Sequence, residues 1–199
     1  MNHSKFHSRG HETAARQGPA EISWTEMLRG GDRIRIRPIH ADDADMEKKF
    51  IEGLSPSARR FRFQYSMVTP GETLLTLLTQ VDPKIDVAFV AVLDDIPGNN
   101  EVGVARLSGA AVGKDCEFAV VVADKWQNKG VGTHLMRHLL AAAQKLGISR
   151  IHSSDASDNH LMRNFARHLH LDHTPDPDDA GRVVYSTLVK KAGDGRRPA

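Results

Sequence analysis

The segment QNKGVG, residues 127–132, has the composition of a loop that binds an anion. It follows the apolar run FAVVVA and precedes the helix-like segment LMRHLLAAAQKL. The first four N–H groups of a helix lack partners within the helix, and the helix dipole is positive at that end. Glycines would let a diphosphate approach these N–H groups without meeting a Cβ atom. The segment is therefore predicted to be a cradle for a pyrophosphate.

Several known glycine patterns can be compared with this segment. The nucleotide P-loop, G-x-x-x-x-G-K-[ST], does not fit, because Lys129 precedes Gly130 instead of following a second glycine. The dinucleotide fingerprint G-x-G-x-x-G begins correctly at Gly130 and Gly132, but its third position is Leu135. The pattern Gln/Arg-x-x-Gly-x-Gly/Ala fits throughout. A plain strand-to-helix turn without a ligand is the alternative interpretation.

The rest of the chain has the pattern of strands and helices that would hold this loop in place. Strands are expected on both sides of the turn 30–32, and at residues 87–93, 101–108, 116–123, 150–154 and 182–189. Helices are expected at residues 42–54, 57–64, 71–81, 130–146 and 159–171. Gly147 is expected to end the fourth helix in the left-handed conformation. The fold class is α/β (α+β), with a mixed, mostly antiparallel sheet of about six or seven strands flanked by helices.

The composition is that of an ordinary globular protein. We expect one domain over residues 21–190, with disordered tails at residues 1–20 and 191–199. The 27 basic and 25 acidic residues leave a net charge of +2, which favours neither nucleic acid nor an acidic membrane as a partner. The chain has no secretory signal, no apolar run of about 18 residues and a single cysteine, so a cytoplasmic location is expected.

With these elements placed, the chain resembles the GNAT (Gcn5-related) N-acetyltransferases over roughly residues 25–190. QNKGVG, preceded by EFAVVVADKW, is similar to the acetyl-CoA site of that family. RIRPIHADDAD resembles its opening strand and first helix, and DNHLMRNFARHLHL resembles a later helix. LSPSARRFRF is similar to the N-terminal region of the bacterial protein-lysine acetyltransferases. The resemblance implies a single GNAT-like domain whose central strands splay apart, near Val120 and Ile151, to bind acetyl-CoA.

The resemblance also implies which residues bind the cofactor. The backbone of Val120 and Val122 would pair with the pantetheine arm, and the N–H of Val120 would point at the thioester oxygen. Asn159 would contact the same arm. The pyrophosphate would be held by the N–H groups of Gln127, Asn128, Lys129, Gly130, Val131, Gly132 and Thr133.

Transfer to an amine also requires the amine to lose a proton. A lysine-like amine with a pKa near 10.4 costs roughly 4–5 kcal/mol to deprotonate at pH 7. A nearby carboxylate can accept that proton, directly or through water. Glu117 is the candidate base, because it begins the apolar strand shortly before Val120, and lysine acetyltransferases of this family carry a glutamate near this position. The alternative is a solvated carboxylate at the entrance of a strand.

Two neighbouring positions bear on the mechanism. Cys116 adjoins Glu117 and could suggest a covalent mechanism, but no base is paired with it in the sequence, so it is interpreted as a core cysteine. Ala166 stands where many family members have a tyrosine that protonates the leaving thiolate. The general acid is therefore not assigned: water could serve as the donor, and Tyr65 and Tyr185 stay open as alternatives.

Histidines and arginines at short spacing have simpler interpretations. The histidines are His3, His7 and His11 in the N-terminal tail and His168, His170 and His173 near the C-terminus. Neither group has the Cys or carboxylate spacing of a metal site, and no metal is predicted. Arg59, Arg60 and Arg62 are interpreted as a solvated helix face, although they lie where the substrate is expected to enter, and an acidic acceptor that uses them is the alternative.

The leading functional hypothesis is an acetyl-CoA-dependent N-acetyltransferase that transfers acetyl directly to a primary amine, most simply a protein lysine. A small-molecule amine as acceptor is an alternative within the enzymes. A non-catalytic acetyl-CoA-binding sensor domain is an alternative from another class. Nothing in the sequence fixes the oligomeric state, and a homodimer stays open.

Overall fold

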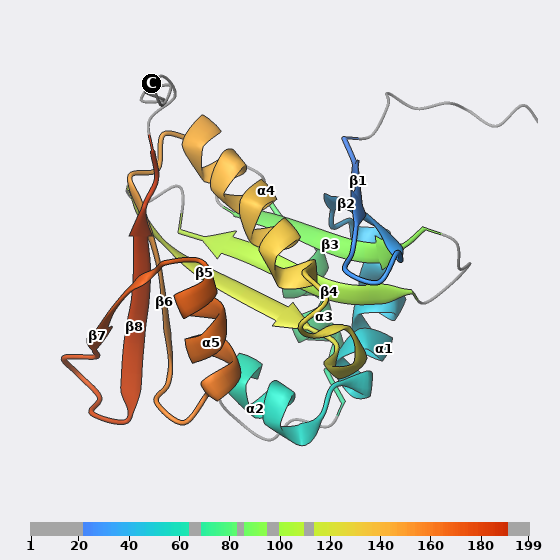
Figure 1. Ribbon diagram of the computed structural model, residues 1–199. Helices are drawn as coiled ribbons and strands as arrows, with labels where there is room; N and C mark the ends of the chain where they lie inside the picture. The colour runs from blue at the N-terminus through green and yellow to red at the C-terminus, as the bar shows by residue number, and fades with distance from the viewer. Residues whose placement is uncertain (1–21, 64–68, 83–85, 95–99, 110–113, 191–199) are drawn as a thin grey trace, which may run out of the picture.

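The computed structural model describes residues 22–63, 69–82, 86–94, 100–109 and 114–190 (Figure 1). The predicted tails and the histidines at positions 3, 7 and 11 lie outside these ranges. A single sheet runs through the described chain, and helices cover both of its faces (Figure 1). The predicted fold class is confirmed.

The sheet has eight strands in the order β1-β2-β3-β4-β5-β6-β8-β7. Their bounds are β1 Trp24–Met27, β2 Arg33–Pro38, β3 Val87–Leu93, β4 Glu101–Ser108, β5 Asp115–Val122, β6 Arg150–Ala156, β7 Asp172–Pro175 and β8 Arg182–Leu188. All neighbours are antiparallel except β5 and β6, which are parallel. The prediction missed β7, a fully exposed edge strand that ends in a proline and has no apolar alternation.

The helices divide between the two faces of the sheet. One face carries α1 Ala44–Gly53, α2 Pro56–Phe63 and α3 Glu72–Thr79, and the other carries α4 Val131–Lys145 and α5 His160–His168 (Figure 1). Short 3-10 turns, Ala41–Asp43 and Asp124–Trp126, precede α1 and the loop before α4. Among the described residues, every helix is too short or too polar to cross a lipid bilayer.

Helix α4 is fixed to the sheet by one apolar stripe. Val131, Leu135, Leu139 and Ala143 recur every four residues and are almost completely buried against β3, β4 and β5. Gly147 has φ +73° just after the helix, so the predicted left-handed end is confirmed. The packing of this stripe holds the N-terminus of α4 at the end of β5, where the predicted anion loop lies.

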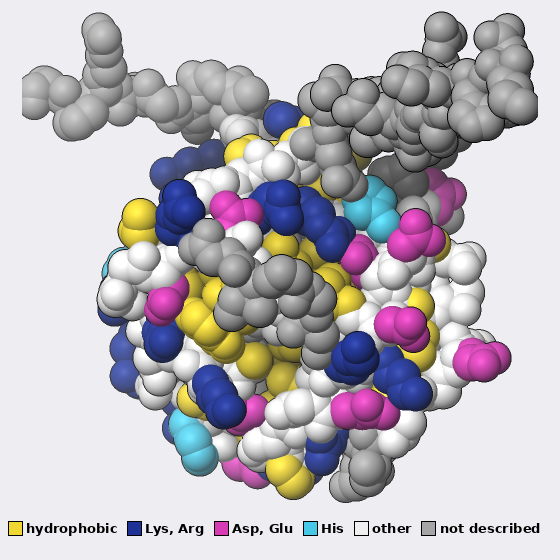
Figure 2. Space-filling model, turned by 90° about the vertical axis from the view of Figure 1, so that its right-hand side faces the viewer, with side chains coloured by type: hydrophobic (Ala, Val, Ile, Leu, Met, Phe, Trp, Pro, Cys, Tyr) yellow, Lys and Arg dark blue, Asp and Glu magenta, His cyan; other side chains and the backbone are white. Residues whose placement is uncertain are grey.

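On the face at the β1 edge, Lys and Arg side chains are interspersed with Asp and Glu (Figure 2). This mixture agrees with the balanced composition of the whole chain. Among the described side chains visible on that face, the two charge signs alternate, whereas a nucleic-acid-binding surface would present an extended patch of positive charge.

Two carboxyl groups are buried together between α1 and β4. Glu47 is 2% exposed and Glu101 is 8% exposed. Burial, and then the neighbouring Glu47 carboxylate, raises the pKa of Glu101 well above its usual range. Glu101 therefore holds its proton to a higher pH in the folded chain than in the unfolded chain.

This difference predicts a pH-dependent stability. The folded chain binds more protons than the unfolded chain at every pH between the ordinary glutamate pKa and the raised one, so stability falls by up to about 1.4 kcal/mol per pH unit in that window. Gln cannot ionise, so we expect Glu101→Gln to lose less stability than wild type between pH 5 and pH 8. For each kcal/mol of unfolding free energy that wild type loses and Glu101→Gln keeps, the Tm of the variant should fall by about 2–4 °C less than the Tm of wild type.

Thermal unfolding of both proteins at the two pH values measures this effect. Glu52→Gln removes an exposed carboxylate from α1 and should follow the wild-type pH dependence. An advantage of Glu101→Gln that does not grow from pH 5 to pH 8 would contradict the proposed burial effect.

Candidate active site

The central strands β5 and β6 separate in the middle of the sheet. They pair only at Asp115↔Arg150, Cys116↔Ile151 and Glu117↔His152. Beyond this point β5 stays paired with β4 as far as Val122, and β6 stays paired with β8, so the two strands diverge (Figure 1). The predicted splay is present, but Ile151 is still paired and the opening begins after His152.

The hydrogen-bond pattern of β5 shows which main-chain groups face the opening. Ala123 N donates to Val102 O at 2.9 Å. Hydrogen-bonded pairs alternate along an antiparallel ladder, so Val121 is turned towards β4, whereas Val120 and Val122 present their N–H and C=O groups to the open edge. The carbonyl of Val122 accepts a bond of 3.2 Å from the Gln127 side chain. The open edge of β5 thus leads directly to the loop before α4.

The two glycines of that loop are required for different reasons. Gly130 is the residue before the first turn of α4 and has φ +101°, a conformation that other residues rarely adopt. Gly132 lies inside the helix, where an added Cβ would lie 3.1 Å from Phe165 Cε2 and 3.6 Å from Val122 Cγ2. Gly130 therefore shapes the loop, and Gly132 permits α4 to pack closely against α5.

A cleft of about 530 Å³ joins the open strand edge to the loop. Every residue predicted for the cofactor or for proton abstraction lines it, except Lys129. The ammonium of Lys129 instead lies 3.5 Å from Asp32 Oδ2 and 4.2 Å from the centroid of the Trp126 ring. The structure therefore brings together the residues that the sequence singled out, but it turns the Lys129 side chain away from them.

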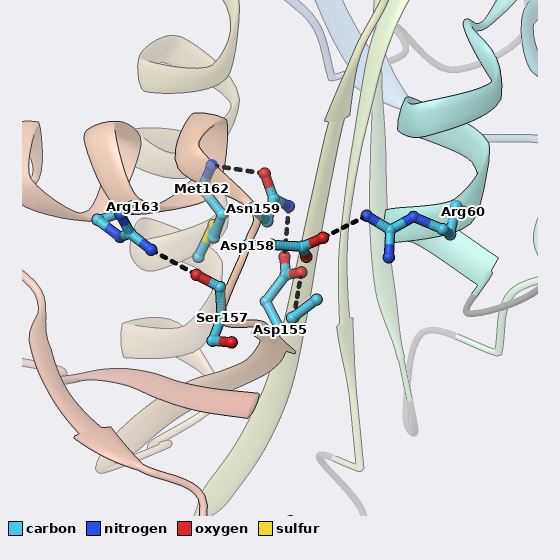
Figure 3. Close-up of polar contacts among 8 residues, drawn as sticks. Arg60, Asp155, Ser157, Asp158, Asn159, Met162 and Arg163 are labelled. Carbon is cyan, nitrogen blue, oxygen red and sulfur yellow. Dashed lines mark hydrogen bonds and ion pairs between the residues drawn. The ribbon is translucent and has the colours of Figure 1, made fainter. Parts of the chain in front are cut away.

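Asn159 occupies the N-terminus of α5 and is buried in the wall of the cleft. Its Oδ1 accepts from Met162 N at 3.1 Å, and its Nδ2 donates to Asp155 Oδ2 at 3.0 Å (Figure 3). Burial raises the pKa of the Asp155 carboxyl group. The Asn159 side chain thus caps α5 and fixes Asp155, and its contact with a cofactor stays a prediction.

Glu117 lies where β5 and β6 part, and its side chain lines the cleft. Arg62 on α2 lines the same cleft. Burial, and then the neighbouring Arg106, lowers the pKa of the Arg62 guanidinium, whereas Glu47 and Glu117 oppose that shift. This end of the cleft therefore places the Glu117 carboxylate beside the half-buried positive charge of Arg62.

The predicted solvated arginine face is correct for only one of its three members. Arg60 is exposed and forms a 2.8 Å ion pair with Asp158 (Figure 3). Arg59 donates to the carbonyls of Glu52 and Leu54 at the end of α1. The prediction is wrong for Arg62, because α2 packs against β5 and Arg62 lines the cleft.

The other residues considered from the sequence are Cys116, Ala166 and the histidines near the C-terminus, and they lie partly in the core and partly at the cleft. Cys116 is 1% exposed in the core beneath α4, and burial raises the pKa of its thiol, so the interpretation as a core cysteine is confirmed. Ala166 is 2% exposed and belongs to the same core. His168 lines the cleft, but His170 and His173 do not. Among the described residues, no group of three or more His, Cys, Asp or Glu could hold a metal ion.

Other residues of the cleft were not anticipated. Phe61 and Phe165 provide apolar walls, Asp155 is the last residue but one of the diverging strand β6, and Arg29 comes from the turn between β1 and β2. The polar residues at the end of β6 were a usable signal for Asp155. Arg29 is held at the cleft by the hydrogen bond from Arg29 N to Lys129 O, between residues about 100 positions apart in the chain. No local sequence pattern could have indicated this contact.

Comparisons with known proteins agree with this geometry. Residues 59–170 match the Acetyltransferase (GNAT) family. The acetyltransferase PA5475 of Pseudomonas aeruginosa is 35% identical over 162 residues, which cover 81% of this chain and 87% of that protein.

Solved structures show the same fold. The GNAT domain of S. lividans PAT has a TM-score of 0.78 at 23% identity, covering 86% of this chain and 99% of that one. The Escherichia coli ribosomal-protein-S18-alanine N-acetyltransferase has a TM-score of 0.59 at 12% identity, covering 82% of this chain and 99% of that one. With the family match and the Pseudomonas relative, these findings show that the chain belongs to the GNAT acetyltransferase family and is an N-acetyltransferase.

Proposed function

We propose that this enzyme transfers an acetyl group from acetyl-CoA directly to a primary amine, and that the amine is a protein lysine. The observation that supports the cofactor is the continuous surface from the open edge of β5 to the N-terminus of α4. It offers unpaired main-chain groups to an amide-containing arm and N–H groups to a diphosphate. Acetyl-CoA would supply the activated acetyl group.

In this proposal, main-chain groups hold and polarise the thioester. The N–H groups of residues 127–133 bind the diphosphate at the positive end of the α4 dipole. The N–H and C=O groups of Val120 and Val122 hold the pantetheine arm as an added strand. The N–H of Val120 donates to the thioester oxygen, and this hydrogen bond strengthens as negative charge grows there.

Glu117 would take the proton of the attacking amine. Its carboxylate lies where the two strands part and faces the cleft from the side of α2. A proton accepted there leaves the amine nitrogen with the lone pair that attacks the thioester carbon. The core position of Ala166 offers no hydroxyl group, so water would protonate the leaving thiolate.

The choice of a lysine acceptor rests on the LSPSARRFRF segment and not on the fold, because one fold serves many acceptors. A small amine is the second candidate within the enzymes, and an acetyl-CoA sensor is the candidate outside them. A lysine acetyltransferase acetylates proteins, a small-amine acetyltransferase acetylates small amines, and a sensor binds acetyl-CoA without acetylating either. Two measurements, of CoA binding and of acetyl transfer, therefore separate the three functions.

The test combines calorimetry with CoA and a thiol-release assay with acetyl-CoA. The assay offers lysine-containing proteins in one arm and polyamines, aminoglycosides and amino acids in the other. We expect CoA binding, and thiol release that depends on the protein arm. Release with small amines alone would replace the lysine proposal, and binding without release in either arm would favour a sensor. Well-folded protein that does not bind CoA would refute the proposed cofactor.

A further inference from the structure

The turn between β1 and β2 is fixed against the loop before α4. Arg29 N donates to Lys129 O at 3.1 Å, and Lys129 Nζ lies 3.5 Å from Asp32 Oδ2. Farther along the same hairpin, Glu26 contacts α4 through His138 Nε2 at 2.8 Å and His134 Nδ1 at 3.1 Å. The hairpin therefore forms a second wall beside the predicted diphosphate cradle.

This wall contributes one arginine, Arg29, to the lining of the cleft. Arg29 is exposed and lines the cleft together with Asn128 and Gly130. Among the described residues, its guanidinium makes no hydrogen bond or ion pair. Lys129, although it lies within the loop itself, is directed to Asp32 and Trp126. The other arginine that lines the cleft, Arg62, is near Glu117 at the opposite end.

The main chain of the loop can offer only N–H groups to a ligand with several negative charges. CoA carries a diphosphate and, on its ribose, a separate phosphate monoester. A guanidinium binds phosphate oxygens through charge-assisted, often paired, hydrogen bonds that a neutral N–H group cannot match. A guanidinium beside the cradle thus adds a positive charge and charge-assisted hydrogen bonds, which the main chain of the cradle cannot provide.

We propose that Arg29 binds a phosphate group of CoA, so that the N-terminal hairpin completes the cofactor site. This inference rests on the proposed function, because it needs CoA to occupy the cleft. It adds to the site a residue that lies about 100 positions before the loop in the sequence. Arg29 fixes the turn through its main-chain N–H, so its side chain is available to the ligand.

The test is calorimetry of wild type, Arg29→Gln and Arg29→Lys with CoA and with dephospho-CoA, which lacks the ribose monoester. We expect Arg29→Gln to bind CoA about tenfold more weakly and Arg29→Lys to keep part of the affinity. A loss confined to CoA assigns Arg29 to the monoester, and an equal loss with dephospho-CoA assigns it to the diphosphate. Both results support the proposal, and in both the effect should shrink at high salt.

Arg167→Gln provides the matched control, since it removes an exposed arginine from α5 that does not line the cleft. It should bind both ligands like wild type. The proposal is wrong if Arg29→Gln, folded with an unchanged Tm, binds CoA as tightly as Arg167→Gln does. Failure of wild type to bind CoA would instead refute the proposed function, so the two failures are distinguishable.

Discussion

Replacing Glu117 with glutamine is expected to lower kcat for amine acetylation by about 10²–10⁴-fold at pH 7 and to leave the affinity for CoA unchanged. The glutamine side chain has nearly the same shape as glutamate but cannot accept a proton from the amine. CoA affinity should persist because the proposed cofactor contacts are main-chain groups of Val120, Val122 and the loop. Steady-state rates and CoA calorimetry on the same preparation measure the two effects.

The deficit of Glu117→Gln should also depend on pH. Below the pKa of the acceptor amine, each unit of added pH increases the unprotonated fraction of the amine about tenfold. Because less of the amine then has to lose a proton on the enzyme, the kcat of Glu117→Gln should approach the wild-type kcat as the pH rises. A purely structural role would not produce this recovery.

The matched control for Glu117→Gln is Asp115→Asn. Asp115 is a carboxylate on the same face of β5 that pairs with Arg150 and His152 at the surface and does not line the cleft. We expect it to keep near-wild-type kcat. If Glu117→Gln turns over at the wild-type rate at pH 7, Glu117 is not the base.

Much of the fold could be predicted because its signals are local. The apolar stripe of α4, its end at Gly147 and the meander from β3 to β5 all follow from residue spacing within each element. Strand β7 was missed because it is exposed along its whole length and pairs at one edge only. The parallel pairing of β5 with β6, which creates the splay, has no local signal and was expected only from the family resemblance.

The residues of the site likewise fall into those that the local sequence indicates and those that depend on elements far apart in the chain. The loop 127–132 and Glu117 could be found from the sequence, because the strand, the glycines and the helix are consecutive. The environment of Arg62 could not, since its neighbouring carboxylates, Glu47 and Glu117, belong to elements far away in the chain. An arginine in a helix as polar as α2 has the appearance of a solvated residue until the sheet beneath the helix is known.

The conformation of Gly130 gives the second large expected effect. Its φ of +101° is unfavourable for any residue with a Cβ atom, at a cost of about 1–3 kcal/mol. In Gly130→Ala the loop would relieve this strain by changing its backbone, which would turn the N–H groups before α4 away from their present direction. We therefore expect CoA affinity to fall about 10–100-fold.

The other end of α4 supplies the control. Gly147 also has a left-handed backbone, with φ +73°, but it lies at the far end of the helix and outside the cleft. Gly147→Ala should lower the free energy of unfolding by about 1–3 kcal/mol, the same range as Gly130→Ala, and should leave CoA affinity unchanged. Chemical denaturation of both variants measures the loss of unfolding free energy, and calorimetry measures the loss of CoA affinity. Equal CoA affinities for the two variants would show that the anion loop does not need the backbone that Gly130 provides.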